Sequence, residues 1–411
     1  MKRKIIFSCL CVVAVVVGII LNRMADMDIE NSKMKVPKKR VEKIDDRAEK
    51  LQESFEVDNG NDVPVDDIDK DIEDQTFTSL RYAAYTDDGF YVYDNMSNLI
   101  SFVDKKTCKM VPLCSKPDCA HNYVDCDAFY YTFNAIFAYN GDIYVVAGDT
   151  NTSTMCLYRI NRDGSERTLV RTLFAIEDDT AYSFVFSLHK GCLYMAVDNL
   201  ADDYYTENDS YLYCYPLDSK NKKEILKHTG YHASIMVVNC DGDNIYLSEF
   251  ERDKPGFGDV REVNKYVCYN TKDETMTELN VREGYYVCYC KDGKILADYS
   301  ESEPPEYNIS KYELHQLGID GKKDKVVYSN ENFIFDHSCT DSKYQYMIIN
   351  KDEQRYLIAV SHDGKEVHQT DAKDYSIMVW SDKENILLKS ETGKYALCNI
   401  KTGKIEEVCM R

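Results

Sequence analysis

The sequence predicts an all-β fold, a β-propeller of four-stranded antiparallel blades that follows an N-terminal transmembrane helix and a stalk. Three observations lead to this prediction. There is an apolar run near the N-terminus, a turn that returns about every 50 residues, and a chain composition of 33 Tyr and 15 Phe against one Trp. Tyrosine favours pleated, half-buried surfaces, where its ring is buried and its hydroxyl stays in water.

The recurring turn carries Asp, Asn or Lys beside Gly and separates two strand-like runs. Its glycines are spaced by 52, 50, 51 and 51 residues: Gly89, Gly141, Gly191, Gly242 and Gly293. Less regular turns near Lys343 and Lys383 continue the series. A period of this length is typical of a solenoid or a propeller. We therefore expect seven blades in residues 76–411, with six or eight as the alternatives.

Each repeat is expected to contain four strands, as the second one illustrates. Apolar runs at 135–139, 143–147, 155–160 and 167–170 alternate with turns that include Asn140-Gly141 and Asp163-Gly164. Asn-Gly and Asp-Gly between apolar runs are the strongest short-range signals of a β-hairpin. No stretch of the body has a convincing helical period, so antiparallel blades are expected rather than a parallel α/β sheet.

Residues 1–22 are expected to form a transmembrane anchor or a signal. Three basic residues at 2–4 precede 17 uncharged residues at 5–21, and a helix of that length is roughly 26 Å long. Signal peptidase prefers small residues at −3 and −1, whereas the best cleavage site, after Ala25, has Arg23 at −3. We therefore favour a retained single-pass anchor. The basic cluster predicts a cytoplasmic N-terminus and a propeller on the extracytoplasmic side.

Residues 23–75 are expected to form a charged stalk. Apolar residues recur at intervals of three and four, as on one face of a short helix: Val41, Ile44, Ala48, Leu51 and Phe55. An acidic block at 58–74 follows, with eight Asp or Glu against one Lys. A block of this kind is typically a solvated, extended spacer.

Overall charge and motif content narrow the classes of function. The net charge of −21 argues against nucleic acid as a partner, because no basic patch in the body overrides the repulsion. The sequence contains no G-x-S-x-G, H-E-x-x-H, G-x-x-x-x-G-K-[ST] or G-x-G-x-x-G motif. No catalytic residue is therefore assigned, and a non-enzyme is favoured.

The densest group of chemically active side chains has the spacing C-x4-C-x-H-x4-C: Cys114, Cys119, His121 and Cys126. Three thiols and one imidazole are a ligand set for tetrahedral, structural zinc. Outside the membrane, disulfide bonds are the equal alternative, with Cys108 as a fifth thiol, and free or redox-active thiols are a third. In each case the segment is expected to be a pinned loop.

Most of the remaining cysteines lie within strand runs. Buried cysteine behaves as a small hydrophobic residue, so these side chains are expected to fill the core. Cys288 and Cys290 are two residues apart in one strand, which predicts that they point to the same face of its sheet.

The long loops are expected to share one face of the propeller, because second-to-third-strand and blade-to-blade connections lie on the same side. The longest of these are 198–211, 250–265 and 298–310. They contain tyrosines and carboxylates that suit a protein, a peptide or a glycan. The predicted ligand-binding residues are Asp202, Asp203, Tyr204, Tyr205, Phe257, Tyr299, Glu301, Glu303 and Tyr307.

Three sequence segments resemble known propellers. The 157–170 segment LYRINRDGSERTLV and the turn at 85–89 look like TolB-like and YWTD-like bacterial propellers. The 113–129 segment LCSKPDCAHNYVDCDAF resembles one found in uncharacterised, membrane-anchored propellers of bacterial envelopes. The resemblance covers most of residues 76–411. It implies an extracytoplasmic binding or scaffold role and supplies no catalytic residues.

Two functions are consistent with these features. The first is a membrane-tethered binding or scaffold propeller that recognises a protein, peptide or envelope glycan through its acidic, tyrosine-bearing face. The alternative is an extracytoplasmic hydrolase or lyase with carboxylates at the propeller channel. An enzyme requires titratable groups that converge in one pocket, whereas a binding module requires a contoured aromatic face.

Overall fold

The computed structural model describes residues 82–122, 125–149, 152–177, 181–200, 205–256, 261–303 and 308–410. The predicted anchor (1–22) and stalk (23–75) lie outside these residues. The described part of the chain consists of β-strands, turns and loops. It contains no helix with the length and apolar character needed to cross a membrane.

The strands form a five-stranded sheet and four four-stranded sheets, besides a seven-stranded one. The first sheet consists of β1 (Ala83–Thr86), β2 (Gly89–Asp94), β3 (Leu99–Asp104), β4 (Lys109–Pro112) and β28 (Cys409–Met410). The second consists of β5 (Phe133–Tyr139), β6 (Asp142–Asp149), β7 (Thr154–Asn161) and β8 (Thr168–Ala175).

Three further four-stranded sheets lie later in the chain. The first contains β16 (Tyr286–Lys291), β17 (Lys294–Glu303), β18 (Asn308–Gly318) and β19 (Lys325–Asn330). The next contains β20 (Ile334–Thr340), β21 (Tyr344–Lys351), β22 (Gln354–Ser361) and β23 (Val367–Asp371). The last contains β24 (Tyr375–Ser381), β25 (Asn385–Ser390), β26 (Tyr395–Asn399) and β27 (Ile405–Glu407).

The seven-stranded sheet is two antiparallel units that share one strand. Its members are β9 (Ala181–His189), β10 (Cys192–Leu200), β11 (Glu207–Pro216), β12 (Lys223–Asp241), β13 (Asn244–Arg252), β14 (Glu262–Asn270) and β15 (Met276–Glu278). β12 pairs with β11 through its first half and with β13 through its second half. The pairing shifts between Tyr231 and Ser234, where His232 has a φ of 55°. This bulge lets one strand pass from one unit to the next.

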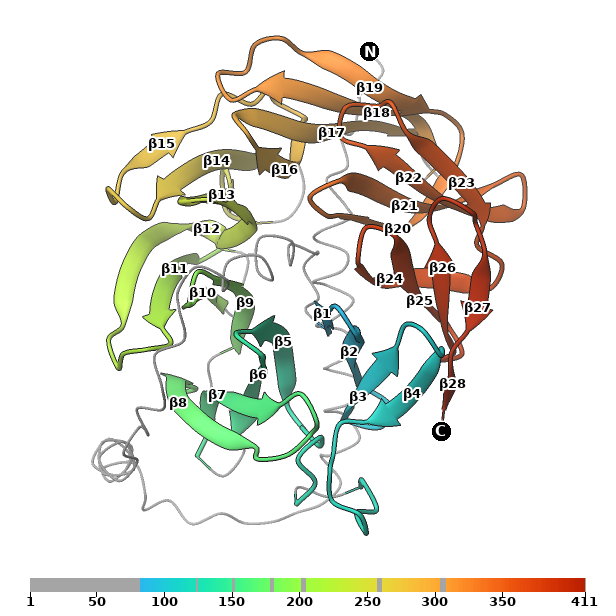
Figure 1. The fold of residues 1–411 in the computed structure, drawn as a ribbon. Helices are drawn as coiled ribbons and strands as arrows, with labels where there is room; N and C mark the ends of the chain where they lie inside the picture. Colours follow the sequence, from blue (N-terminus) through green and yellow to red (C-terminus); the bar gives the residue numbers. More distant parts are fainter. Residues whose placement is uncertain are drawn as a thin grey trace.

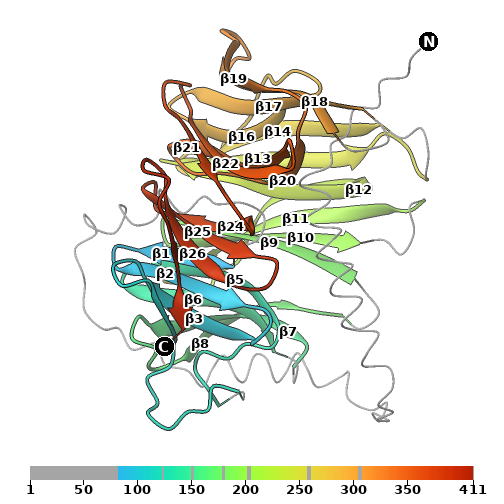
Figure 2. The ribbon, with the colours of Figure 1, turned by 90° about the vertical axis from the view of Figure 1, so that its right-hand side faces the viewer.

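The sheets stand around a central axis as a β-propeller (Figure 1). The strands β1, β5, β9, β12, β16, β20 and β24 contact one another in this order, and β24 contacts β1, so the ring is closed. Seen from the side, β11 and β12 extend farther to the right of the view than the first sheet does (Figure 2). The predicted all-β fold of four-stranded antiparallel units is thus confirmed.

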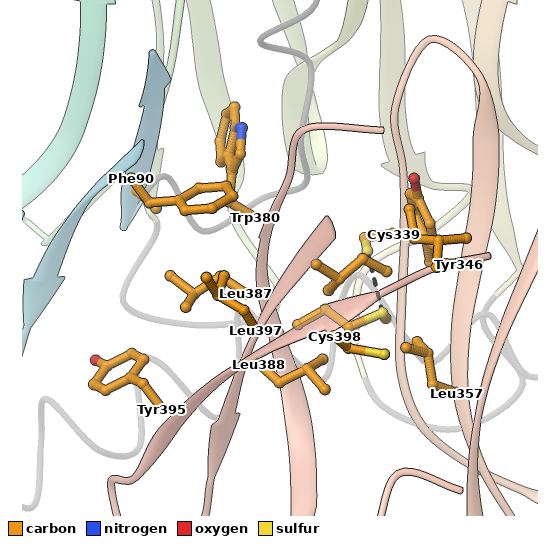
Figure 3. Close-up of a cluster of buried hydrophobic side chains, with 14 of the residues drawn as sticks. Phe90, Cys339, Tyr346, Leu357, Trp380, Leu387, Leu388, Tyr395, Leu397 and Cys398 are labelled. Carbon is orange, nitrogen blue, oxygen red and sulfur yellow. Dashed lines mark hydrogen bonds between the residues drawn. The ribbon is translucent and has the colours of Figure 1, made fainter. Parts of the chain in front are cut away.

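The closure of the ring brings the two ends of the described chain together. The two-residue strand β28 pairs in parallel with β4, and the Cys409 amide donates to the Cys108 carbonyl at 2.9 Å. A hydrophobic cluster joins the first sheet to the last two (Figure 3). The single tryptophan, Trp380, is 1% exposed in this cluster, together with Phe90 from β2 and Leu397 from β26.

A tyrosine occupies the third position of the second strand in several units: Tyr91, Tyr144, Tyr194, Tyr246 and Tyr346. Four of the rings are buried, and that of Tyr144 is half-buried. The Tyr346 hydroxyl lies 2.8 Å from the Ser381 hydroxyl of the following sheet. Part of the tyrosine excess is therefore explained by packing between neighbouring sheets.

Three hairpin glycines with positive φ pack against the main chain that precedes their own sheet. A Cβ on each would meet a carbonyl oxygen at 2.8, 2.2 or 2.4 Å, which is far inside contact distance: Gly164 against Leu113, Gly321 against Asn280, and Gly364 against Val327. Glycine allows both the left-handed backbone and this close approach. These turns therefore form close contacts between neighbouring sheets.

We expect Gly364→Ala to destabilise the protein more than Gly293→Ala. Both glycines have positive φ, 74° and 70°, but a Cβ at Gly293 meets open space. The left-handed backbone costs about 1–2 kcal/mol in either variant, and the collision at Gly364 adds roughly 1–3 kcal/mol. Chemical denaturation of the full chain measures the difference, and equal losses would contradict the close contact at Gly364.

Two local predictions need correction. Much of the 198–211, 250–265 and 298–310 segments is strand, because antiparallel pairing continues along the β10–β11, β13–β14 and β17–β18 hairpins. Cys288 and Cys290 do not share a face, because a bulge between Val287 and Tyr289 reverses the alternation. Cys288 packs toward the β20–β23 sheet, and Cys290 packs toward the β13–β14 unit.

Candidate metal centre and ligand-binding face

The cysteine-rich segment connects β4 to β5 at the outer edge of the ring (Figure 1). Both of its ends are tied to the β3 main chain. The Leu113 amide donates to the Ile100 carbonyl, and the Ile100 amide donates to the Ala128 carbonyl, each at 2.9 Å. Phe129 forms an isolated antiparallel bridge with Leu99. The loop between these ties is therefore closed at its base.

The four predicted side chains come together within this loop. One ligand atom from each lies within 4.8 Å of the others: Cys114, Cys119, His121 and Cys126. The Cys126 sulfur lies 3.5 Å from His121 Nδ1. Cys126 is buried, whereas the other three are partly exposed. In the described part of the chain, no other group of three or more Cys, His or carboxylate side chains gathers this closely.

Different environments act on the thiols of this cluster. The backbone amide of His121 lowers the pKa of Cys119, because it stabilises the thiolate. Burial raises the pKa of the Cys126 thiol to about 12. A bound cation would favour both thiolates, since a coordinating thiol is deprotonated.

The arrangement can hold one tetrahedral metal ion through four protein donors. Zinc is the usual ion for three sulfurs and one imidazole nitrogen. A single disulfide would use two of the three thiols and leave one thiol and the imidazole without a partner of that kind. Cys108 is not part of the cluster, because its thiol donates to Glu406 at 3.4 Å.

The second sheet supports the loop that carries the Cys114, Cys119, His121 and Cys126 cluster. Arg167, just before β8, donates from Nη1 to the Cys126 carbonyl at 3.1 Å and to the Phe129 carbonyl at 2.9 Å. The Ser115 amide donates to the Gly164 carbonyl at 3.2 Å. The loop therefore joins the first two sheets. No sequence pattern indicated this role of Arg167 and Gly164, although both belong to the segment that resembles other propellers.

The predicted ligand-binding face is described only in part. Asp202, Asp203, Tyr204, Phe257 and Tyr307 lie outside the described residues, as does the Glu303 side chain. Tyr205 is 64% exposed. Its ring lies against Gly256 of the β13–β14 connection, so close that a Cβ there would be 3.0 Å from it. Two of the expected loops therefore meet.

Tyr299 and Glu301 lie on β17 rather than in a loop. The Tyr299 hydroxyl donates to the Glu301 carboxylate at 2.8 Å. This bond raises the pKa of Tyr299 to about 12, since it stabilises the protonated phenol. The Tyr299 ring is flanked by Tyr285, with ring centroids 5.8 Å apart, and by the Lys311 ammonium at 5.8 Å. The pair forms a fixed aromatic and acidic patch.

Two aspartates expected at the start of the loops are instead held inside the hairpins. Asp198 is 5% exposed and accepts hydrogen bonds from the Ser210 and Ser234 hydroxyls at 2.5 and 2.8 Å. Burial raises its pKa to about 6. Asp298 is partly buried on β17, and removal of its carboxyl group from water raises its pKa to about 7. When polar residues recur along a strand, the sequence alone does not show which of their side chains point toward the interior.

Carboxylates on or beside the inner strands are engaged in structural contacts. Asp336 accepts from Arg355 Nε and from the Asn350 side chain, both at 2.6 Å. Asp341 accepts from the Tyr346 hydroxyl at 2.5 Å and from the Ser381 hydroxyl at 2.9 Å. The Asp336 bonds lie within the β20–β23 sheet, whereas the bond from Ser381 to Asp341 joins that sheet to the next one. Both carboxylates are thus engaged in structural contacts.

No protein-family model and no curated protein matches the sequence. Among solved structures, the chain is similar to an acylaminoacyl peptidase in complex with Z-Gly-Gly-Phe-chloromethyl ketone, with 11% identity, a TM-score of 0.51, and coverage of 81% of this chain and 52% of that one. The chain is also similar to a prolyl endopeptidase structure, with 9% identity, a TM-score of 0.51, and coverage of 88% of this chain and 53% of that one. For the β-propeller domain of the Trilobed protease from Pyrococcus furiosus, the identity is 10% and the TM-score is 0.46, with coverage of 81% of this chain and 98% of that one.

These likenesses concern the fold alone. The chain spans about half the length of the two peptidases it matches. Their activities are therefore properties of those proteins.

Proposed function

We propose that this chain is a non-catalytic recognition propeller, tethered to the membrane by residues 1–22 and held on the extracytoplasmic side by the stalk. Its partner is a protein, a peptide or an envelope glycan. One observation carries the proposal: Tyr205 is 64% exposed at the end of the β10–β11 hairpin, yet its ring is seated on Gly256 of the next hairpin. An exposed aromatic ring that packs against a neighbouring loop is a typical anchor of a binding interface.

We also propose a number of blades for the propeller and a relation to known bacterial propellers. We count seven blades, because β12 serves as the outer strand of one four-stranded blade and as the inner strand of the next. The relation to TolB-like and YWTD-like propellers rests on the sequence segments at 85–89 and 157–170. The enzyme alternative is less well supported, since Asp336 and Asp341 are engaged in structural contacts.

The cysteine cluster is proposed to hold structural zinc. Four protein donors would complete the tetrahedron, which leaves no open position for a substrate. Arg167 and Gly164 brace the loop against the second sheet. The zinc would thus fix a blade-to-blade connection on the rim of the propeller.

A photo-crosslinking amino acid at position 205 tests the recognition face in the full chain in its native membrane. We expect a crosslinked partner from position 205 and none from position 106, which is exposed in the β3–β4 turn. Sedimentation with purified cell-wall glycan identifies a glycan partner, and Tyr205→Ala is expected to weaken it roughly tenfold or more. Equal crosslinking from both positions, or none from 205, would contradict the proposal.

A further inference from the structure

The outer edge of β14 has no described strand partner over more than half of its length. β14 covers Glu262–Asn270, but β15 pairs only with Val267, Cys268 and Tyr269. By contrast, β8 pairs with β7 from Thr154 to Arg159, and β12 pairs with β11 from Glu207 to Cys214. Residues 262–266 of β14 therefore extend beyond their neighbouring strand (Figure 1).

The direction of the exposed main-chain groups follows from one hydrogen bond. The Leu279 amide donates to the Tyr266 carbonyl at 2.8 Å, so the Tyr266 main chain faces away from β13. In an antiparallel strand every second residue faces the same side. The amides and carbonyls of Glu262 and Asn264 thus face outward too, and no described strand pairs with them on that side.

A trough runs along this edge. It encloses about 260 Å³ and is lined by residues 263–266 of β14 on one side and by Glu278, Leu279 and Val281 on the other. Val263 and Val281 are partly exposed there, whereas Leu279 is buried. Lys265 and Glu278 lie 3.4 Å apart and neutralise each other. The trough thus presents main-chain hydrogen-bonding groups and apolar side chains rather than a net charge.

We infer that this edge binds one extended peptide segment of another protein, which adds a strand to β14 between Glu262 and Tyr266. The outward amides and carbonyls of Glu262 and Asn264, which no described strand pairs with, are complementary to another extended main chain. An apolar side chain of the peptide would face Val263 and Val281. Glu278, Leu279 and Val281 flank the edge on its outer side. The edge of a second copy of this propeller would bring its own sheet with it, so a free peptide segment is the occupant that we propose. The site shares no residue with the recognition face proposed above.

The probe is a capped, fluorescent hexapeptide with the sequence of β19, Lys-Val-Val-Tyr-Ser-Asn. β19 covers the third strand of the following sheet, which is the place that β15 leaves partly open. The matched probe carries N-methyl groups on alternate amides, so it keeps every side chain but loses the hydrogen-bonding edge. We expect the full chain to bind the first peptide and to bind the methylated one at least tenfold more weakly. Hydrogen exchange at residues 262–266 should slow on binding.

Two variants at one position separate main-chain from side-chain recognition. Asn264→Pro removes the outward amide, and proline is tolerated on edge strands where the N–H faces away from the ladder. We expect this variant to lose peptide binding and Asn264→Ala to retain it. The methylated peptide keeps the test valid on the unmodified protein even if Asn264→Pro does not fold.

Three results would overturn the inference: no binding of the unmethylated peptide, equal binding of both peptides, or unchanged exchange at 262–266 in the complex. Tyr205→Ala is expected to bind the peptide normally. The strand site and the recognition face can therefore fail separately.

Discussion

Replacing Cys126 by serine is expected to abolish binding of the zinc ion that we propose for the cysteine cluster. Cys126 is the buried member of the Cys114, Cys119, His121 and Cys126 cluster. Its loss leaves three donors and an open position, so we expect zinc affinity to fall by roughly two orders of magnitude or more. Because the ligands join β4 to β5, the loop should also become more susceptible to proteolysis. Metal analysis and thiol titration of the purified full chain give the zinc content and the number of free thiols of the unmodified protein and of Cys126→Ser.

Cys108→Ser is the matched control for this prediction. Cys108 bonds to Glu406 and lies outside the cluster, so its loss should leave the metal content unchanged. One zinc per chain with the cluster thiols reduced would support the proposed site. A metal-free protein with two thiols of the cluster oxidised would instead establish a disulfide.

Replacing Asp298 by asparagine is expected to stabilise the protein at high pH and to have little effect at low pH. Burial raises the pKa of the Asp298 carboxyl to about 7, against 3.8 as its ordinary value. The folded state therefore binds the proton more tightly than the unfolded state does. The unfolding free energy of the unmodified protein should decrease as the pH rises from about 4 to 7. Asparagine avoids this loss, which amounts to about 4 kcal/mol at 1.36 kcal/mol per pKa unit.

Asp320→Asn is the control, because its environment acts in the opposite direction. The backbone amide of Lys322 lowers the pKa of Asp320, so its stabilising effect is lost as the pH falls. Urea denaturation of the full chain between pH 4 and 9 distinguishes the two slopes. If Asp298→Asn changed stability equally across this range, burial of the ionised carboxylate would not be the cause.

The repeat was accessible from the sequence because each hairpin depends on local chemistry. Asn140-Gly141 and Asp163-Gly164 set the turns, and β5 to β8 form around them as expected. The cysteine cluster was also accessible, since its four donors lie within 13 residues of one another. Short separations along the chain limit how far apart such side chains can lie.

Features that depend on how side chains alternate between the two faces of a strand were harder to predict from the sequence. One bulge places Cys288 and Cys290 in different hydrophobic clusters, and polar runs taken for loops continue as paired strands. Asp298 looks like a solvated loop residue in the sequence but is partly buried on β17 in the structure. A shift of one residue exchanges the two faces of a strand, and nothing in its composition marks that shift.

The sequence alone thus determined the all-β class, the period and the grouping of three thiols with one imidazole. These follow from turn chemistry and short-range spacing, which act within one hairpin. Only the tertiary structure decided the support of the cysteine loop by Arg167, the closure of the ring by β28, and the open edge at 262–266. Each of these joins or exposes segments of different sheets, and such contacts depend on how the whole ring packs.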